Sequence, residues 1–367
     1  DLMIIIFDKP IKVSCKYTQS TMPSAPIIWD KKNNQGMCKA LIVNSGNANA
    51  HTGIKGLETI DKYTKDLAKY LSCSQKEILV SSTGVIGEQF DSQIISNQIK
   101  ILHKSKNKML IDAAKAICTT DTFVKTSVHN LKIQNKIIKI YGFAKGSGMI
   151  SPNMATMLSY IFIDCEIKST ILKKLLSENI EETFNSISVD SDTSTSDTLM
   201  LFANPTNKVT LNYENIKKIS KKLYTVMKEL SYKIISDGEG IKKLTKITVK
   251  NAKSKSQAKN IAFAICNSPL VKTAISGEDA NWGRVVMAIG KTNEKVIQNN
   301  LTIKFGKILL AKNGERNRRV NLSKVDNYMK KKLIEIEVDL NIGNYSKIVY
   351  GNDLNNEYIN INADYRS

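Results

Sequence analysis

Thr156 is the residue of this sequence best suited to begin nucleophilic chemistry. It follows the small residue Ala155, stands shortly after the chain-breaking pair Pro152-Asn153, and precedes a run of small and apolar residues typical of a strand. Its hydroxyl could attack the carbonyl of Ala155, so that the peptide becomes an ester that water cleaves. The freed α-amine, with a pKa of about 7.7–8, could then act as the base. A β-branched residue that merely begins a strand is the alternative.

The chain offers few groups for histidine-based or metal-based catalysis. Its three histidines (His51, His103 and His129) occupy no recognisable triad or ligand spacing. The six cysteines lie far apart and form no C-x-x-C pair, so neither a disulfide scaffold nor a cysteine-rich zinc site is expected. This cysteine usage fits a reducing, cytoplasmic compartment. Threonine chemistry, which needs no histidine, is consistent with such a composition.

Four segments are dense in Gly, Asn, Ser and Thr and lie directly beside apolar stretches. They are residues 44–53, 81–88, 145–157 and 237–240. Each alone is typical of a turn, because these residue types dominate turns. Four of them at strand ends together predict a site lined by backbone amides.

The elements that must position these segments follow from length and hydrophobic spacing. A chain of 367 residues with 42% hydrophobic and 24% charged residues is globular, with one large domain or two. Its apolar runs are too short to span a bilayer, and the opening residues 1–7 read as a strand rather than a signal peptide. The pattern predicts a mixed α/β fold without regular βαβ periodicity. Strands are expected at 40–43, 78–80, 137–141 and 157–163, helices at 57–71, 108–117, 167–184 and 213–235, and strand character at 294–311 and 333–362.

The charge balance alone would suggest a polyanion-binding protein. The chain has 54 basic and 34 acidic residues, a net charge of +20. Only five of the basic residues are arginines, and the lysines are spread along the chain among many Asn and Ile residues. We therefore favour a solvated lysine surface over a nucleic-acid footprint. Polyanion binding would show as steeply salt-dependent association.

The ordered motifs of the chain resemble those of the ornithine acetyltransferase family, the glutamate N-acetyltransferases of arginine biosynthesis. The resemblance runs from about residue 15 to the C-terminus. The motifs are VNSGNANAHTG (43–53), SSTGVIGE (81–88), TTDT (119–122), KGSGMISPNMATML (145–158), SVDSDTSTSDT (188–198), DGEG (237–240), SPLVKTAISGEDANWGR (268–284) and INADYRS (361–367).

The resemblance implies a self-processing acyltransferase fold with β-sheet layers flanked by helices. The precursor would cleave itself between Ala155 and Thr156 into an α chain of residues 1–155 and a β chain of residues 156–367. Thr156 would carry the acetyl group from N-acetylornithine to glutamate in a ping-pong cycle, at a site where the two chains meet. Two α and two β chains would assemble, with no metal or organic cofactor, no nucleic acid and no membrane as partner.

The resemblance also assigns roles to individual residues. Thr83 and Gly84 match the pair that stabilises the oxyanion. The substrate-binding positions match Lys145, one threonine of the pair Thr119-Thr120 (Thr119 on spacing), Glu239, Asn362 and Ser367. We expect Lys145 to bind a carboxylate and Glu239 the ornithine amine.

Two questions stay open at the level of sequence. An amidohydrolase or aminopeptidase of the related self-cleaving fold would pass the acyl group to water instead of glutamate. Use of acetyl-CoA as a further donor is also undecided by any residue. The chain departs from the family pattern at His51, Ser191 and Ile241-Lys242, none of which is the expected nucleophile or an oxyanion donor.

Overall fold

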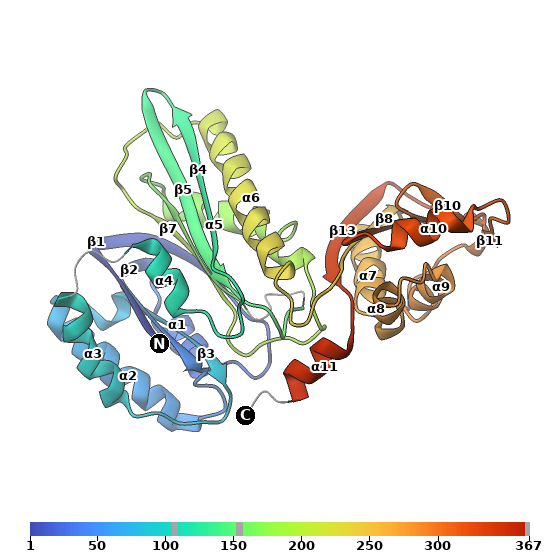
Figure 1. The fold of residues 1–367 in the computed structure, drawn as a ribbon. Coiled ribbons are helices and arrows are strands. Elements are labelled where there is room, and N and C mark those ends of the chain that lie inside the picture. Colours follow the sequence, from blue (N-terminus) through green and yellow to red (C-terminus); the bar gives the residue numbers. More distant parts are fainter. Residues whose placement is uncertain (105–108, 152–156, 364–367) are drawn as a thin grey trace. The chain divides into compact units, whose positions relative to one another are not determined.

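A computed structural model describes residues 1–104, 109–151 and 157–363 of the chain (Figure 1). The chain divides into two compact units, each built on one sheet. Unit 1 comprises Asp1–Asn185 and Asp192–Ile234, and unit 2 comprises Ser186–Ser191 and the chain from Ile235 onward. The mixed α/β class expected from the sequence is confirmed. The expected cleavage between residues 155 and 156 lies outside the described residues. It would divide the chain by breaking a peptide bond, whereas these units are divided by their packing, so the units do not test it.

Unit 1 contains a seven-stranded sheet in which neighbours are mostly antiparallel. The two exceptions are the parallel pairs β2–β3 and β6–β7. The strand order is β3 (Ile78–Val85), β2 (Met37–Asn47), β1 (Leu2–Tyr17), β7 (Thr198–Ala203), β6 (Leu158–Ile163), β5 (Lys136–Lys145) and β4 (Lys125–Ile133).

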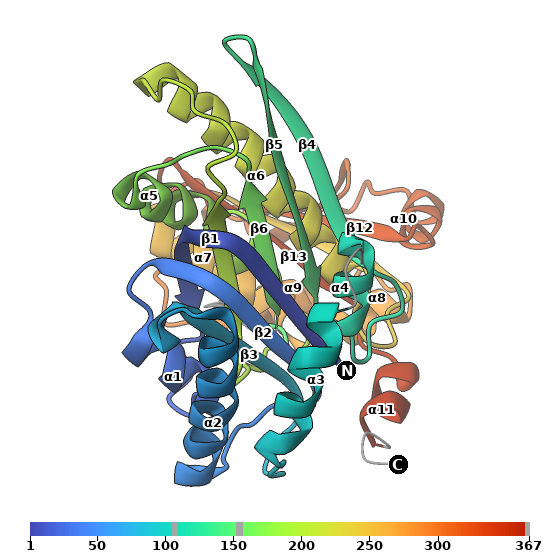
Figure 2. The same ribbon diagram turned by 90° about the vertical axis from the view of Figure 1, so that its left-hand side faces the viewer.

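Strand β1 connects two halves of this sheet. Its first half pairs with β2 and its second half, from Lys12 to Tyr17, pairs with β7, with an irregularity between Ile6 and Ile11. Apolar side chains from both halves share one core cluster, and the rings of Phe162 and Phe202 stack 5.0 Å apart within it. The two halves therefore face each other, and Figure 2 shows β1–β3 in front of β4–β6.

Helices cover the outer face of the β2–β3 half. These are α1 (Ala25–Asn33), α2 (Gly53–Leu71) and α3 (Ser92–Lys104), which pack on Ala40, Ile42, Ile78 and Val80. The alternate residues Leu41 and Val43 point into the inner core instead. Because both faces are buried, the strand at 40–43 is a continuous apolar run rather than an alternating one. The helical spacing from Leu57 to Leu71 correctly predicted α2.

The remaining elements of unit 1 also follow sequence patterns. Helix α4 (Leu110–Ala116) lies near β1, β4 and β5, α5 (Ser169–Ile180) packs on β1 and β7, and α6 is Tyr213–Ile235. Ser74 and Glu77 form a capping box at the short helix η1 (Gln75–Glu77), where the Ser74 amide donates to Glu77 Oε2 at 3.1 Å. A further short helix, η2, is Phe184–Ser186. Within the described ranges, every helix is too short or too polar to cross a membrane.

Unit 2 contains a six-stranded sheet with one helical layer packed against its core. The strand order is β11 (Glu315–Arg316), β10 (Ile308–Lys312), β9 (Thr302–Phe305), β12 (Leu333–Asp339), β8 (Leu244–Ala252) and β13 (Tyr345–Asn352). The helices are α7 (Lys255–Cys266), α8 (Pro269–Ser276), α9 (Trp282–Gly290), η3 (Gln298–Asn300), α10 (Leu322–Met329) and α11 (Asn356–Ala363). Apolar residues of α7, α8 and α9 join those of the strands in one cluster.

Segment 186–191 is held in unit 2 by a buried lysine. The Lys272 ammonium donates to the carbonyls of Val189 at 2.7 Å and Asn352 at 2.8 Å. Burial lowers the pKa of Lys272. Ser188 adds a hydrogen bond to Asn267 of 2.6 Å. The ammonium therefore replaces water at carbonyls that would otherwise be buried without a donor.

The predicted strand character of residues 333–362 is wrong beyond residue 355. The alternating isoleucines of β12 and β13 end there, and α11 follows. Asn355 caps the helix, since its Oδ1 accepts from the amides of Glu357 at 2.9 Å and Tyr358 at 3.3 Å. The alternation of Ile359 and Ile361 with asparagines resembled a strand, but the cap determines the local structure.

Asp30 is a fully buried carboxyl group in α1. Its Oδ1 accepts from the Val80 amide at 3.0 Å, and the Tyr17 hydroxyl donates to its Oδ2 at 3.2 Å. Burial raises the pKa of Asp30 well above its usual value. The folded protein therefore retains a proton on Asp30 over a pH range in which the unfolded chain releases it.

This raised pKa makes stability fall as the pH rises, starting near the unfolded pKa of about 3.9. Asp30→Asn removes the titration, so wild type should lose stability relative to this variant between pH 4.5 and 7, by up to about 1.4 kcal/mol per pH unit. Urea unfolding at several pH values measures the difference. Asp8→Asn, at an exposed carboxyl on β1, is the control. Parallel pH curves for wild type and Asp30→Asn would contradict the assignment.

Candidate active site

The ends of β3 and β5 meet at Lys145, the last residue of β5. The Lys145 ammonium donates to Thr83 Oγ1 at 3.1 Å and to Thr119 Oγ1 at 2.8 Å. Lys145 is 3% exposed and Thr83 is 6% exposed, so the contact between them is shielded from water, whereas Thr119 is exposed. The structure thus brings together three residues that the sequence predicted for the site. Their catalytic and binding roles stay predictions.

The two candidate threonines differ in their contacts. Thr119 accepts from Lys145, whereas the hydroxyl of Thr120 lies 2.6 Å from that of Ser147. Thr119, the choice made from spacing, is therefore the one in contact with the lysine.

Gly84 occupies a backbone position that requires glycine. Its φ is +134°, and a Cβ there would lie 2.2 Å from the carbonyl carbon of Gly46, its partner in the β2–β3 ladder. Residues with a side chain rarely adopt this conformation, and here backbone rather than a flexible side chain blocks the space. Strands β2 and β3 approach each other closely at Gly46 and Gly84, and this contact fixes the path of the backbone beside Thr83.

Asp121 links the elements around Lys145, although no sequence pattern singled it out. Its Oδ1 lies 2.5 Å from the Lys125 ammonium and accepts from the Gly146 amide at 2.8 Å. Its Oδ2 accepts from the Thr119 amide at 3.2 Å and lies 4.0 Å from the Lys145 ammonium. Burial alone would raise the pKa of Asp121, but Lys145 and Lys125 outweigh it and hold the pKa below its usual value. Asp121 is therefore an anion enclosed by donors.

The sequence indicated the ion pair of Asp121 and Lys125 only through the positions of the two residues. Asp121 stands within the TTDT motif, and Lys125 follows it by four residues. In a lysine-rich chain that spacing does not distinguish a buried ion pair from a solvated lysine.

Asp197 is a second buried carboxyl group that sequence patterns did not single out. It lies just before β7, and its Oδ1 accepts from the Met157 amide at 2.8 Å. Burial raises the pKa of Asp197 well above its usual value, against the opposing effects of that amide and of Lys145. In the next ladder position Leu158 pairs with Lys145 on one side and Thr198 on the other. The start of β6 is thus fixed beside Lys145.

Three expected site residues cannot be placed. Ala155, Thr156 and Ser367 lie outside the described residues. Met157 is the described residue nearest in sequence to the expected nucleophile.

The two other expected substrate-binding residues lie together in unit 2. Asn362 in α11 donates from Nδ2 to Glu239 Oε2 at 3.1 Å. The turn that carries Glu239 packs tightly on α11, because a Cβ on Gly240, whose φ is +66°, would lie 2.3 Å from the Tyr358 amide nitrogen. The DGEG turn therefore needs its last glycine for this packing.

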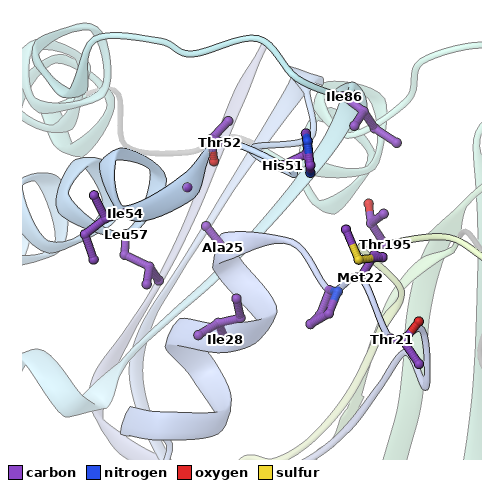
Figure 3. Close-up of a pocket in the computed structure, with 12 residues that line it drawn as sticks. Thr21, Met22, Ala25, Ile28, His51, Thr52, Ile54, Leu57, Ile86 and Thr195 are labelled. Carbon is purple, nitrogen blue, oxygen red and sulfur yellow. The ribbon is translucent and has the colours of Figure 1, made fainter.

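A separate apolar cavity of about 470 Å³ lies in unit 1 (Figure 3). Ile86 and Thr195 in its wall stand two residues from Gly84 and Asp197 respectively, and His51 contributes with a φ of +56°. Among the described residues of its wall none carries a carboxylate or ammonium group, so these residues do not share the chemistry of the Lys145 cluster. The lining residues are Thr21, Met22, Pro23, Ala25, Ile28, His51, Thr52, Gly53, Ile54, Leu57, Ile86 and Thr195.

The described residues contain no cluster of three or more His, Cys, Asp or Glu side chains that could hold a metal ion. None of the six cysteines, all of which are described, is paired in a disulfide. Hydroxyls, ammonium groups, buried carboxyls and backbone amides are the reactive and polar groups that the strand ends supply.

Comparison with known proteins gives a consistent family. The model of the ArgJ family matches residues 1–367. Proteins named "Arginine biosynthesis bifunctional protein ArgJ" from Brucella melitensis and Bartonella henselae are 44% and 46% identical over 376 residues, covering all of this chain and 91% of each relative. The crystal structure of the protein of that name from Bacillus halodurans matches with a TM-score of 0.52 and 34% identity, over 56% of this chain and 97% of that one. This chain therefore belongs to the ArgJ family.

Proposed function

We propose that this chain transfers the acetyl group of N-acetylornithine to glutamate through an ester on Thr156, after cleaving itself between Ala155 and Thr156. The relatives at 44–46% identity are named as arginine biosynthesis proteins, which supports this pathway. The observation that carries the proposal is the Lys145 cluster. A buried ammonium group joins the two threonine hydroxyls at 3.1 and 2.8 Å, beside the start of β6.

The position of Met157 supports Thr156 as the reacting residue. Met157 follows Thr156 by one peptide bond, and its amide is anchored on Asp197 at 2.8 Å. The next residue, Leu158, pairs with Lys145. A nucleophile one residue before this anchor would be delivered to a rigid strand end, as precise acyl transfer requires.

In the proposed cleavage, Thr156 Oγ forms a bond to the carbonyl carbon of Ala155, and the bond from that carbon to the Thr156 nitrogen breaks. The hydroxyl proton passes to the departing nitrogen, which becomes an α-amine. Water then hydrolyses the ester and leaves a carboxylate on Ala155. Thr83 and Gly84 would donate to the oxyanion that forms in each step, a contribution of about 3–4 kcal/mol per donor in comparable acyl transfers.

The transfer cycle uses the same groups. The Thr156 α-amine takes the proton from its own hydroxyl, and Oγ attacks the acetyl carbonyl of N-acetylornithine. Ornithine leaves with the proton, and the amine of glutamate then attacks the acetyl ester and regenerates Thr156. Lys145 with Thr119 would bind a substrate carboxylate, and Glu239 with Asn362 and Ser367 the ornithine end. No metal or organic cofactor enters these steps.

Acetyl-CoA would be a second acetyl donor to Thr156, in addition to N-acetylornithine. The relatives are named bifunctional, which supports a second reaction at the same nucleophile. A cytoplasmic location is part of the proposal and is consistent with cysteines that are not paired in disulfides. Assembly from two copies of each cleaved chain completes the proposed enzyme.

Self-cleavage at Thr156 should change the mass of the purified protein. Wild type should give two masses that correspond to residues 1–155 and 156–367, and Thr156→Ala should give one uncut mass, because it lacks the attacking oxygen. Intact-mass spectrometry of the purified proteins measures this. Thr156→Ser keeps a hydroxyl and should still cleave. An uncut wild type, or a cut Thr156→Ala variant, would contradict the proposal.

The second prediction concerns what holds the cleaved chains together. Strands β6 and β7 of the proposed β chain lie between β1 and β5 of the α chain, with antiparallel ladders on both sides. The two fragments should therefore stay associated after cleavage and separate only when the protein is denatured. Native mass spectrometry compared with denaturing mass spectrometry tests this. Fragments that separate in native buffer would show that the ladders do not hold the chains.

The third prediction separates transfer from hydrolysis. N-acetylornithine should be consumed rapidly only when glutamate is present, with N-acetylglutamate as product. Lys145→Met should lower this rate about 100-fold or more, since it removes a buried donor of the site. Chromatographic assay of ornithine, acetate and N-acetylglutamate measures all three species. Release of acetate at the same rate without glutamate would instead indicate the amidohydrolase.

A further inference from the structure

We propose that the Asp121–Lys125 ion pair positions Lys145, and through it the hydroxyls of Thr83 and Thr119. This inference deepens the proposed function, on which it rests, by naming two positioning residues that sequence motifs did not indicate. Neither residue is proposed to touch the substrate.

The pair is enclosed within unit 1. Both side chains have no exposed surface, and the Lys125 ammonium lies 2.5 Å from Asp121 Oδ1. The same ammonium stands 4.9 Å from the centre of the Phe123 ring, which favours a cation there. A buried charge is strongly unfavourable without its partner, so each residue holds the other in place.

Asp121 fixes three separate segments of the site. It accepts from the amide of Thr119, after α4, and from the amide of Gly146, after β5. Lys125 is the first residue of β4. The carboxylate therefore sets the distance between the hydroxyl of Thr119 and the ammonium of Lys145, which lie 2.8 Å apart.

Asp121 is a charged neighbour of both lysines in this cluster. One carboxylate, that of Asp121, is shared by the ammonium groups of Lys125 at 2.5 Å and Lys145 at 4.0 Å. Asp197 also acts on Lys145, but burial raises its pKa and favours its neutral form. The ionised carboxylate of Asp121 thus lies between the two ammonium groups, beside the hydrogen bonds that Lys145 makes with Thr83 and Thr119.

Loss of the Asp121 charge should displace Lys145. Without it, the ammonium groups of Lys125 and Lys145 would lose the carboxylate that lies near both and would repel each other more strongly, so Lys145 would move away from Thr83 and Thr119. Asp121→Asn keeps the shape of the side chain and one oxygen that can accept from a backbone amide. The variant therefore changes mainly the charge.

A double-mutant cycle tests whether Asp121 acts through Lys145. We would measure kcat/KM for N-acetylornithine in the presence of glutamate for wild type, Asp121→Asn, Lys145→Met and the double variant. Asp121→Asn should lower kcat/KM about 10- to 100-fold in the wild-type background, which is less than loss of a direct donor. It should change kcat/KM less than about twofold when Lys145 is already Met, because the group it positions is then absent.

A purely structural role would give a different result. Asp121→Asn would then cost the same factor in both backgrounds, and that additivity would overturn the inference. Asp30→Asn is the matched control, since it makes the same carboxyl-to-amide change at another fully buried aspartate of unit 1. Its effect should be the same with and without Lys145. Thermal unfolding of each variant separates loss of stability from loss of positioning.

Intact-mass spectrometry measures the extent of self-cleavage for each protein of the double-mutant cycle. The values of kcat/KM are then compared for the cleaved enzymes only. Uncut Asp121→Asn beside normally cut Lys145→Met would overturn the inference, because Asp121 would then act by another route. Should Asp121→Asn fail to fold, Asp121→Asn combined with Lys125→Met removes both buried charges together and should fold. Full activity of that double variant would also overturn the inference.

The outcomes distinguish this inference from the proposed function. No glutamate-dependent turnover by wild type, or full turnover by Lys145→Met, would refute the function or the role of Lys145 in it. Loss of turnover in Lys145→Met with full turnover in Asp121→Asn would refute only the positioning role of the ion pair.

Discussion

Strand β1 belongs to both halves of the sheet in unit 1, and this shared strand is the constraint on which the site depends. In the strand order, β3 and β5 stand five positions apart. A flat sheet would separate them by about 24 Å, at about 4.8 Å per strand. The hydrogen bond of 3.1 Å between Lys145 and Thr83 exists because β1 lets the two halves face each other. The aromatic core between the halves stabilises that arrangement.

The buried carboxyl groups of unit 1 show how surroundings differentiate one residue type. Asp30 and Asp197 are desolvated with few opposing charges, so their pKa values are raised. Asp121 is also desolvated, yet two ammonium groups and a backbone amide keep it ionised. Groups whose environments push their pKa values apart often mark a site of proton or acyl chemistry. Here Asp121, whose pKa is lowered, and Asp197, whose pKa is raised, both interact with Lys145.

The proposed self-cleavage is compatible with the strand order for a topological reason. The loop that would be cut connects β5 and β6, which are neighbours in one ladder. Cutting the chain between these two strands frees an α-amine without removing any strand from the sheet. Threonine chemistry of this kind needs no histidine, and the described ends of β3, β5 and β6 supply a lysine, threonines and a buried carboxyl group instead. The site could therefore mature without rearranging the fold that positions it.

The sequence by itself determined the mixed α/β class, the helices α2, α4, α5 and α6, most of the strands, the glycine-rich strand ends and the family. These are local features, since apolar spacing, caps and turn residues act over a few neighbouring positions. It failed at α11, where the cap of Asn355 outweighed an alternating pattern. Only the tertiary structure decided which polar groups are buried together. Lys145 and Thr83 are 62 residues apart in sequence, and Asp121, Lys125 and Asp197 gain their character from burial and from partners that no local pattern specifies.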